Sequence, residues 1–430
     1  MTPSSDQLDS TVIRSVIETG IGLLERKCIR LNGRDPNWRA LFSEELENLT
    51  RASSPAEFET RVNAVIARGG LSHVAFFHES AQRAPARYAI NATFCAIDTP
   101  QGKRWLFEDV HEGGPAHVAG IRPGDVLLSA NSRQIYAPEV LTFGLGTDAE
   151  LTIEGGNGSS RQVQVVLPKA EPGKAKAKPP MAQPASVTAR QIKPGIGYVK
   201  IAFFPGVNGQ RFARELDRAL AEIPGCTRLI VDLRGNLGGF VGSLRLMSYL
   251  TSDRVPVGYS LTRKGEDQKW RPDQLACIDK LPATRLDTLK MAVRFLILHR
   301  DRSIRLVTEG LGSKPFHGRI VMLVNEHTLS AGEMVAAFAT ENGLARIVGT
   351  RTGGQVLGGG NFSVGHGFVL RFPAAGWYTW RGAIVEGRGV EPDVDVPLST
   401  DGLRQGRDNQ LETAIATVEG IQPGVESRTG

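Results

Sequence analysis

The chain has 430 residues, which is long enough for two or three domains. Its hydrophobic share of 41% and charged share of 22% are typical of a globular protein, and no apolar run approaches the ~18–20 residues that span a bilayer. The formal net charge of +6 is modest, and no dense lysine–arginine cluster interleaved with aromatic residues occurs. Composition therefore gives no support for a nucleic-acid-binding protein or for a membrane span.

The four cysteines, Cys28, Cys95, Cys226 and Cys277, lie far apart and form no CxxC pair. Neither a zinc site built on paired cysteines nor a disulfide framework is predicted. The first residues carry neither a basic region nor an apolar stretch, so the sequence as it stands predicts a cytoplasmic protein. If a signal peptide has been removed, the protein is instead exported.

Residues 1–85 are predicted to form an N-terminal helical segment. Apolar side chains recur there at the spacing of one helix face, at Val12, Ile13, Val16, Ile17, Ile21 and Leu24. A further helix is expected over Pro55–Ala67, because serines, which are favoured N-cap residues, stand directly before it.

Residues 86–168 resemble a PDZ domain. The resemblance rests on the run Glu112–Asn131, in which a GGPAHVAGI turn and short helix lead through a GD pair into a strand. PDZ domains bind extended peptides at a sheet edge and hold the terminal carboxylate with backbone N–H groups. That carboxylate loop is expected near Ala92–Ile97, where this chain has no glycine. The resemblance thus implies either peptide binding without a free C-terminus or a structural, gating module.

Residues 169–186 are rich in proline, lysine and alanine, which predicts an extended, exposed linker. Strand-like and helix-like patterns alternate over residues 187–400, and this alternation predicts an α/β layered domain. Residues 401–430 are predicted to form a C-terminal helix and tail.

The junction at Ser330 follows a strand-like apolar run, Arg319–Val324, and opens a helix-like run, Met334–Ala339. A serine on such a sharp turn suits a nucleophile, because the helix N-terminus favours developing negative charge. The alternative is a plain helix cap, since serine is also a preferred capping residue.

A second junction, Asp232–Gly239, joins a buried strand to a glycine-rich turn and a helical pattern. The glycines Gly238 and Gly239 allow a backbone N–H to approach a substrate oxygen closely. Together with the N–H of Ala331, one of them could form an oxyanion hole. The alternative is a tight strand-to-helix connection, which glycine also serves.

Two further segments, Gly349–Gln355 and Glu386–Asp393, complete a set of four motifs. Together and in this order they resemble the S41 family of serine peptidases, the C-terminal-processing and tricorn-like proteases. The resemblance covers residues 187–400. It implies a crotonase-like (ClpP-like) catalytic domain that hydrolyses peptide bonds of protein substrates without a metal or cofactor. A homo-oligomer is compatible with the resemblance but is not implied by it.

The resemblance also implies which groups activate the serine. Many S41 enzymes use a lysine after the glycines of the third motif, but Gln355 stands there, which excludes a Ser–Lys pair at that position. The tricorn-like branch uses Ser, His and Glu instead. Its histidine corresponds to His73, although Leu71 replaces the aspartate of that motif, and its glutamate corresponds to Glu386. The implied triad is therefore Ser330, His73 and Glu386.

Alternatives remain at this stage. A single histidine is often structural, and then His78, His327 or His366 would have to replace His73 as the base. A rival function from another class is a catalytically inactive peptide-binding scaffold, which the glutamine in place of the catalytic lysine favours. A different acyl hydrolase on the same fold is a third interpretation.

Overall fold

A computed structural model of the protein describes residues 8–30, 35–79, 83–170, 179–206, 208–239, 241–293 and 303–420. Parts of the predicted linker (171–178) and of the predicted tail (421–430) lie outside the described residues. The chain forms two compact units, each assembled from three separate stretches. The first combines Met1–Ala81, Val255–Thr308 and Gly354–Arg388, and the second combines Gln82–Arg254, Glu309–Gly353 and Gly389–Gly430. The domain boundaries drawn from the sequence stay predictions.

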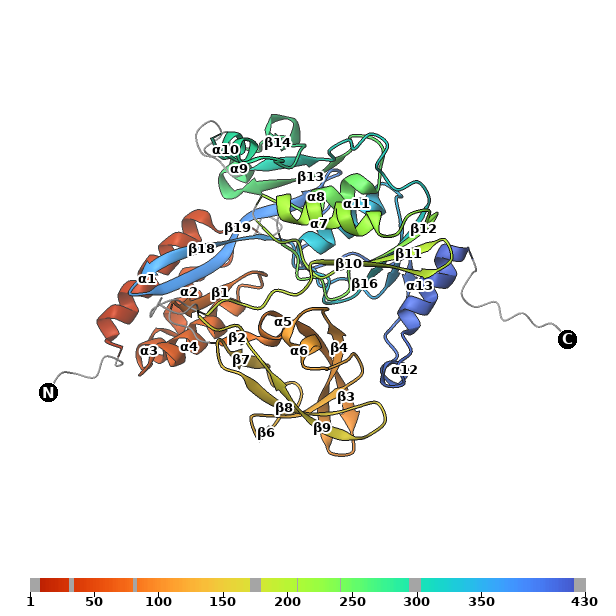
Figure 1. The fold of residues 1–430 in the computed structure, drawn as a ribbon. Helices are drawn as coiled ribbons and strands as arrows, with labels where there is room; N and C mark the ends of the chain where they lie inside the picture. The colour runs from red at the N-terminus through yellow and green to blue at the C-terminus, as the bar shows by residue number, and fades with distance from the viewer. Residues whose placement is uncertain are drawn as a thin grey trace. The chain divides into compact units, whose positions relative to one another are not determined.

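The first unit consists of helices packed against a six-stranded sheet (Figure 1). Its strands pair in the order β1-β19-β13-β15-β14, with β18 added beside β19. They are β1 (Ala75–His78), β13 (Pro256–Thr262), β14 (Ala276–Ile278), β15 (Ile304–Val307), β18 (Gly358–Gly365) and β19 (Phe368–Thr379). The helices are α1 (Ser10–Lys27), α2 (Trp38–Glu44), α3 (Leu46–Thr50), α4 (Pro55–Ala67), α9 (Arg263–Asp267), α10 (Arg285–Val293) and the 3₁₀ turn η1 (Pro272–Gln274).

Helix α1 begins where Asp9 caps it, since the Asp9 carboxylate accepts a hydrogen bond from Thr11 N at 3.0 Å. Its apolar face joins a core that α4, β18 and β19 also line. In that core Phe58, Phe76 and Phe368 pack together, with ring centroids 5.1 to 5.2 Å apart. This packing supports β1, the strand that directly follows the loop carrying His73.

The second unit contains a six-stranded sheet in the order β10-β11-β12-β16-β17-β20. Strands β11 to β20 run parallel, and β10 pairs antiparallel at the edge. The strands are β10 (Val187–Lys193), β11 (Ile196–Ile201), β12 (Arg228–Asp232), β16 (Arg319–Val324), β17 (Arg346–Gly349) and β20 (Val394–Asp395).

Helices cover both faces of this sheet (Figure 1). Figure 1 shows α7 (Gln210–Ala221), α8 (Ser243–Tyr249) and α11 (Ala331–Glu341) together on one side and α13 (Asn409–Glu419) on the other. The buried strands are accordingly almost continuously apolar, as parallel strands covered on both faces usually are. Because β12 and β16 are parallel neighbours, the turns after their carboxyl ends lie side by side.

The same unit contains a second sheet, which is antiparallel. Its strands pair in the order β3-β4-β5-β8-β9, with β6 paired to β5. Its strands are β3 (Ala92–Thr99), β4 (Gly102–Val110), β5 (Val126–Ala130), β6 (Arg133–Gln134), β8 (Ala149–Glu154) and β9 (Ser160–Val165). The short helices α5 (Ala86–Ala89) and α6 (Pro115–Val118) pack on its core, and β2 (Arg83–Pro85) pairs with β7 (Thr142–Gly144).

The carboxylate loop was predicted in the wrong place. Ala92–Ile97 belongs to β3, whose residues from Phe94 onward pair regularly with β4, so it is a strand and not a loop. The turn lies just before it, at Asn91, which has a φ of 57° and is buried. An asparagine tolerates this left-handed backbone better than most residues, so the turn does not need glycine.

The C-terminal segment packs on the outer side of this second sheet. Leu403 of α12 (Thr400–Arg404) lies in one apolar cluster with Leu106 and Val126. A Cβ atom at Gly124 would lie 2.4 Å from the Leu403 carbonyl oxygen, so only glycine fits at this contact.

Candidate active site

Ser330 lies at the junction of β16 and α11, as the sequence predicts. Its backbone has a φ of 52° and a ψ of −117°, a conformation that costs a non-glycine residue free energy and occurs mainly at functional sites. The residue is half-buried, while the residues before and after it, Leu329 and Ala331, are buried. The turn therefore resembles a nucleophile elbow, in which a strained junction presents a hydroxyl at the end of a strand.

Glu333 stabilises this turn through hydrogen bonds of its side chain. It is fully buried, and its carboxylate accepts a hydrogen bond from Ser330 N at 3.2 Å. The other carboxylate oxygen accepts one from Thr352 Oγ1 at 2.7 Å. Thr352 Oγ1 in turn accepts from Val390 N at 2.7 Å, so the third motif is tied to the nucleophile turn. These bonds give Glu333 a structural role at the helix start.

The glycine turn after β12 lies directly against Ser330. A Cβ atom at Gly238 would be 2.5 Å from Ser330 Cβ, and Gly238 has a φ of 78°. Leu329 N also donates to Asn236 O at 2.9 Å, which joins the two turns through their backbones. The close approach explains why glycine is needed here.

The two predicted glycine donors differ in availability. Gly238 N already donates to Asn236 Oδ1 at 2.8 Å. Gly239 is exposed and has a φ of 143°, and neither its N–H nor that of Ala331 makes a hydrogen bond within the described part of the chain. This difference favours Gly239 over Gly238 as the second donor beside Ala331.

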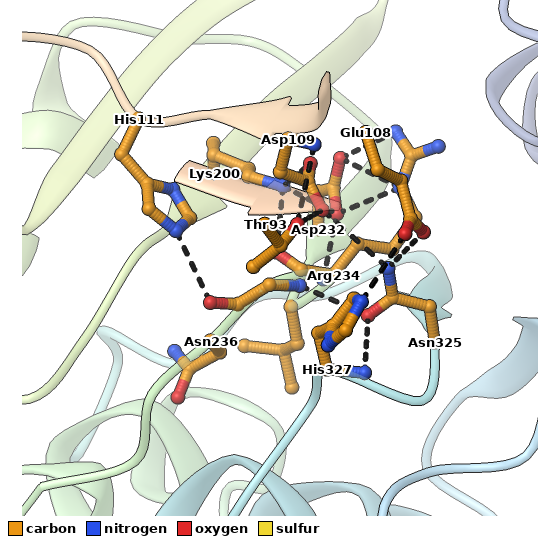
Figure 2. A network of polar contacts seen from close by, with 12 residues as sticks. Thr93, Glu108, Asp109, His111, Lys200, Asp232, Arg234, Asn236, Asn325 and His327 are labelled. Atoms are coloured by element: carbon orange, nitrogen blue, oxygen red, sulfur yellow. Dashed lines mark hydrogen bonds and ion pairs between the residues drawn. The ribbon is translucent and has the colours of Figure 1, made fainter. Parts of the chain in front are cut away.

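A buried ionic network lies beneath the glycine turn (Figure 2). Arg234 forms an ion pair with Asp232 at 2.7 Å and with Asp408 at 2.8 Å. Lys200 pairs with Asp232 at 3.2 Å and with Asp109 at 3.0 Å, and also donates to Arg234 O at 2.7 Å. Burial alone would raise the pKa of Asp232 and Asp109, but these cations hold the pKa of both carboxyls below the usual range. These charges order the glycine turn.

The second sheet reaches both turns through the end of β4. Asn325, the residue after β16, donates from Nδ2 to Glu108 Oε1 at 2.7 Å, and its Oδ1 accepts from Gly235 N at 2.9 Å. His111 Nε2 lies 3.1 Å from Gly235 O. Figure 2 shows these side chains converging from the two sheets. Asn325 thus connects the nucleophile turn, the glycine turn and β4.

His327 also faces β4. Its Nε2 lies 3.1 Å from Phe94 O and 3.3 Å from Glu108 Oε2. Burial would lower the pKa of His327, but the close contact with Glu108 and the negative charge of Glu108 and Glu326 raise it. His327 therefore belongs to the contact between the nucleophile turn and the second sheet.

His73 and Glu386 both belong to the first unit, whereas Ser330, Gly238, Gly239 and Ala331 belong to the second. His73 is half-buried with a φ of 59°, and its Nδ1 lies 2.8 Å from Ser72 Oγ. Glu386 is buried, and its carboxylate accepts from Ser72 N at 3.1 Å and from Val356 N at 2.8 Å. The structure thus brings the predicted histidine loop and the predicted glutamate together.

Sequence reasoning did not single out Glu108, Asp109, His111 or Lys200. One signal was present, because Lys200 is a charged residue inside the otherwise apolar strand β11, and a buried charge requires a partner. No sequence pattern identifies that partner as Asp109, which lies 91 residues earlier.

Comparison with known proteins agrees with this arrangement. Residues 195–396 match peptidase family S41, and residues 106–142 match the PDZ domain. The chain carries an S41 peptidase domain and a PDZ domain. Glu108, Asp109 and His111 all fall within the residues matched by the PDZ domain.

Curated relatives of this chain include tricorn protease homolog 2 of Streptomyces coelicolor, 27% identical over 402 residues, which cover 88% of this chain and 30% of that protein. Tricorn protease of Thermoplasma acidophilum is 29% identical over 189 residues, or 44% of this chain and 14% of that protein. The chain therefore spans less than a third of the length of these relatives.

Solved structures share the fold. The photosystem II D1 C-terminal processing protease covers 91% of this chain and 96% of its own, with a TM-score of 0.52 and 18% identity. Mature CPAF complexed with lactacystin covers 94% of this chain and 97% of its own, with a TM-score of 0.55 and 15% identity. In the described part of this chain, no helix combines the length and apolar composition needed to cross a membrane.

Proposed function

We propose that this protein is a serine peptidase that hydrolyses peptide bonds in protein substrates, with Ser330 as its nucleophile. The observation that carries the proposal is the strained strand-to-helix turn at Ser330, against which the glycine turn packs so closely that Gly238 has no room for a side chain. The N–H groups of Ala331 and Gly239 are the donors for the oxyanion that forms when Ser330 Oγ attacks the scissile carbonyl carbon. The match to the S41 family supports the same reaction.

His73 is the proposed general base. It takes the proton of the Ser330 hydroxyl during attack and gives it to the leaving amine, and water then hydrolyses the acyl-enzyme by the same route. Glu386 is the proposed orienting acid. Support comes from the first unit, where the Glu386 carboxylate holds the backbone of Ser72, and the Ser72 hydroxyl in turn contacts the His73 ring.

The PDZ domain is proposed to bind extended segments of the substrate and to gate the reaction. Support comes from β4, whose end contacts the nucleophile turn through Glu108 and the glycine turn through His111. Any displacement of β4 would therefore act on the backbone that presents Ser330. We further infer that the catalytic domain is of the crotonase-like kind after an N-terminal helical segment, and the parallel sheet with helices on both faces supports this.

The nucleophile is tested with Ser330→Ala. Losing an essential nucleophile costs on the order of a million-fold in turnover, so casein cleavage should disappear while the melting temperature is unchanged. A fluorophosphonate probe should label the wild type at Ser330 and leave the variant unlabelled. Casein cleavage by Ser330→Ala at the wild-type rate would refute the assignment.

His73→Ala should be nearly as inactive as Ser330→Ala, because members of a triad act as a unit. Glu386→Gln should retain more activity, since an orienting acid contributes less than the base. His366→Asn is the matched control: His366 is an exposed histidine of the same unit, and asparagine tolerates its φ of 51°. Full activity in both His73→Ala and His366→Asn would leave His78 and His327 as candidate bases, and full activity in His73→Ala with loss in His366→Asn would identify His366.

The second candidate function is a catalytically inactive peptide-binding scaffold. Gln355, in the place of the lysine that many S41 enzymes use, favours it. A wild-type protein that binds peptides but neither cleaves casein nor reacts with the fluorophosphonate would establish the scaffold and overturn the peptidase.

A further inference from the structure

Three metal-ligating side chains meet where the PDZ domain touches the nucleophile turn. Glu108 comes from β4, and Glu326 and His327 come from the turn between β16 and α11. One ligand atom from each of the three lies within 4.8 Å of the others. Figure 2 shows Glu108 and His327 directed at each other. Carboxylate and imidazole ligands this close together could share one cation after small side-chain movements.

A second observation points to a ligand at this place. Glu108 is only 7% exposed, and its Oε1 is bonded to Asn325. Its Oε2 is buried and makes no hydrogen bond to any residue that the structure describes, and the nearby His327 Nε2 lies 3.3 Å away. A buried carboxylate oxygen without a hydrogen bond is costly, and such groups are rare in folded proteins. A cation bound to Glu108 Oε2 would remove this cost.

The remaining ligands are open to solvent. Glu326 is exposed, and one of its oxygens accepts from Thr350 Oγ1 at 2.8 Å, which leaves the other for a metal. The His327 side chain is 28% exposed. An ion can therefore enter from solvent, and bound water can complete its coordination.

We propose that Glu108, Glu326 and His327 bind one divalent cation of the zinc type, which fastens strand β4 of the PDZ domain to the turn that presents Ser330. One imidazole and two carboxylates match the nitrogen and oxygen ligands of zinc, with water at the fourth position. Calcium and magnesium are less suited, because they take six or more ligands, mostly oxygen. On binding, the cation replaces the proton that the imidazole holds toward Glu108, and that proton is released to solvent.

His327, the member of the site nearest to Ser330 in sequence, lies three residues before it, and the site does not include Ser330, His73 or Glu386. A bound ion adds a rigid link between β4 and the turn, beside the neutral link that Asn325 already makes to Glu108. Occupancy should therefore make the position of the PDZ domain and the geometry of the nucleophile turn more strongly dependent on each other. Binding itself is measured without any peptidase activity, so it stands or falls independently of the proposed function.

The test uses the purified full chain after treatment with a chelator, titrated with Zn²⁺ in a calorimeter and, separately, with Mg²⁺. The variants are Glu108→Gln, Glu326→Gln and His327→Gln. Each amide can keep the hydrogen bond of the side chain that it replaces while removing a metal ligand. His317→Gln, which changes an exposed histidine outside the cluster, is the matched control. Circular dichroism and melting curves confirm that every variant is folded.

The expected result is one equivalent of Zn²⁺ on the wild type and on His317→Gln, with affinity at least tenfold lower in each of the three cluster variants. Zn²⁺ should also raise the melting temperature of the wild type and have less effect on those variants. Co²⁺ should give the visible absorption of a low-coordinate site in the wild type and in His317→Gln. The three cluster variants should not show this absorption. The proposal is overturned if the wild type binds no stoichiometric Zn²⁺, if the cluster variants bind it equally well, or if Mg²⁺ binds as tightly.

Discussion

Acidification should weaken the second unit through His111, the buried histidine between the PDZ domain and the glycine turn. His111 is 3% exposed, its Nε2 lies 3.1 Å from Gly235 O, and its Nδ1 is buried without a hydrogen bond among the described residues. Burial, followed by the Lys200 cation, lowers the pKa of His111 to about 4, although Asp109 opposes the shift. The folded protein therefore holds this imidazole neutral.

The sign and size of the effect follow from the two pKa values. An unfolded chain takes up the proton near pH 6.5, whereas the folded chain resists it until about pH 4. Between these values the unfolded state binds more protons, so the free energy of unfolding falls as the pH falls. The loss attributable to His111 is about 2 kcal/mol at pH 5 and about 3 kcal/mol at pH 4, while the full contribution is present above pH 6.5.

The assay is urea denaturation at pH 7 and pH 5 of the wild type and of His111→Gln. Glutamine keeps a donor for Gly235 O but does not titrate. Other groups change the stability of both proteins alike, so the difference between their pH dependences isolates His111. We expect the wild type to lose about 2 kcal/mol more than the variant between the two pH values. An equal loss in both proteins would show that His111 is not held neutral by burial, and the reasoning would be refuted.

Three further predictions concern the glycine turn, the ionic network and the PDZ domain. Gly238→Ala should lower casein turnover on the order of a hundredfold, because its new Cβ would meet Ser330 Cβ at 2.5 Å. The control is Gly225→Ala, because Gly225 also has a positive φ but has open space where a Cβ atom would lie. Equal losses of turnover in the two variants would contradict the steric argument. Arg234→Ala should cost roughly 3–5 kcal/mol of unfolding free energy, because it removes one of the two cations that pair with the buried Asp232, and a loss below about 1 kcal/mol in urea would count against it. Amidating the C-terminus of a bound peptide should weaken PDZ binding less than about tenfold, ~1.4 kcal/mol, and a larger loss in fluorescence anisotropy would show true carboxylate recognition.

Local sequence patterns predicted the elements around the candidate nucleophile well. The predicted strand Arg319–Val324 coincides with β16, and α11 begins at Ala331, directly after the expected serine. These patterns succeed because strand burial and helix capping are decided by neighbours in the sequence. The S41 and PDZ resemblances are likewise confirmed by the family matches.

Long-range polar contacts could not be predicted in the same way. The bond between Asn325 and Glu108 joins residues 217 positions apart, and the bond between His111 and Gly235 joins residues 124 positions apart. Whether a charged residue on a strand faces solvent or a buried partner depends on how two sheets pack, which a single sequence does not encode locally. The segment predicted as the carboxylate loop, Ala92–Ile97, is instead part of strand β3, and the positive-φ turn before it is made by Asn91, not by glycine.

The assembly of the first unit from three distant stretches has a consequence for synthesis on the ribosome. The apolar faces of α1 and α4 are complete once residue 67 has been made, but their partners in β18 and β19 end only at residue 379. At roughly 5–20 residues per second, the N-terminal helices wait roughly 15–60 s for those strands. During that interval the nascent chain exposes a hydrophobic surface that chaperones recognise. Expression of the protein in cells should therefore depend on chaperone capacity more strongly than the stability of the finished fold would suggest.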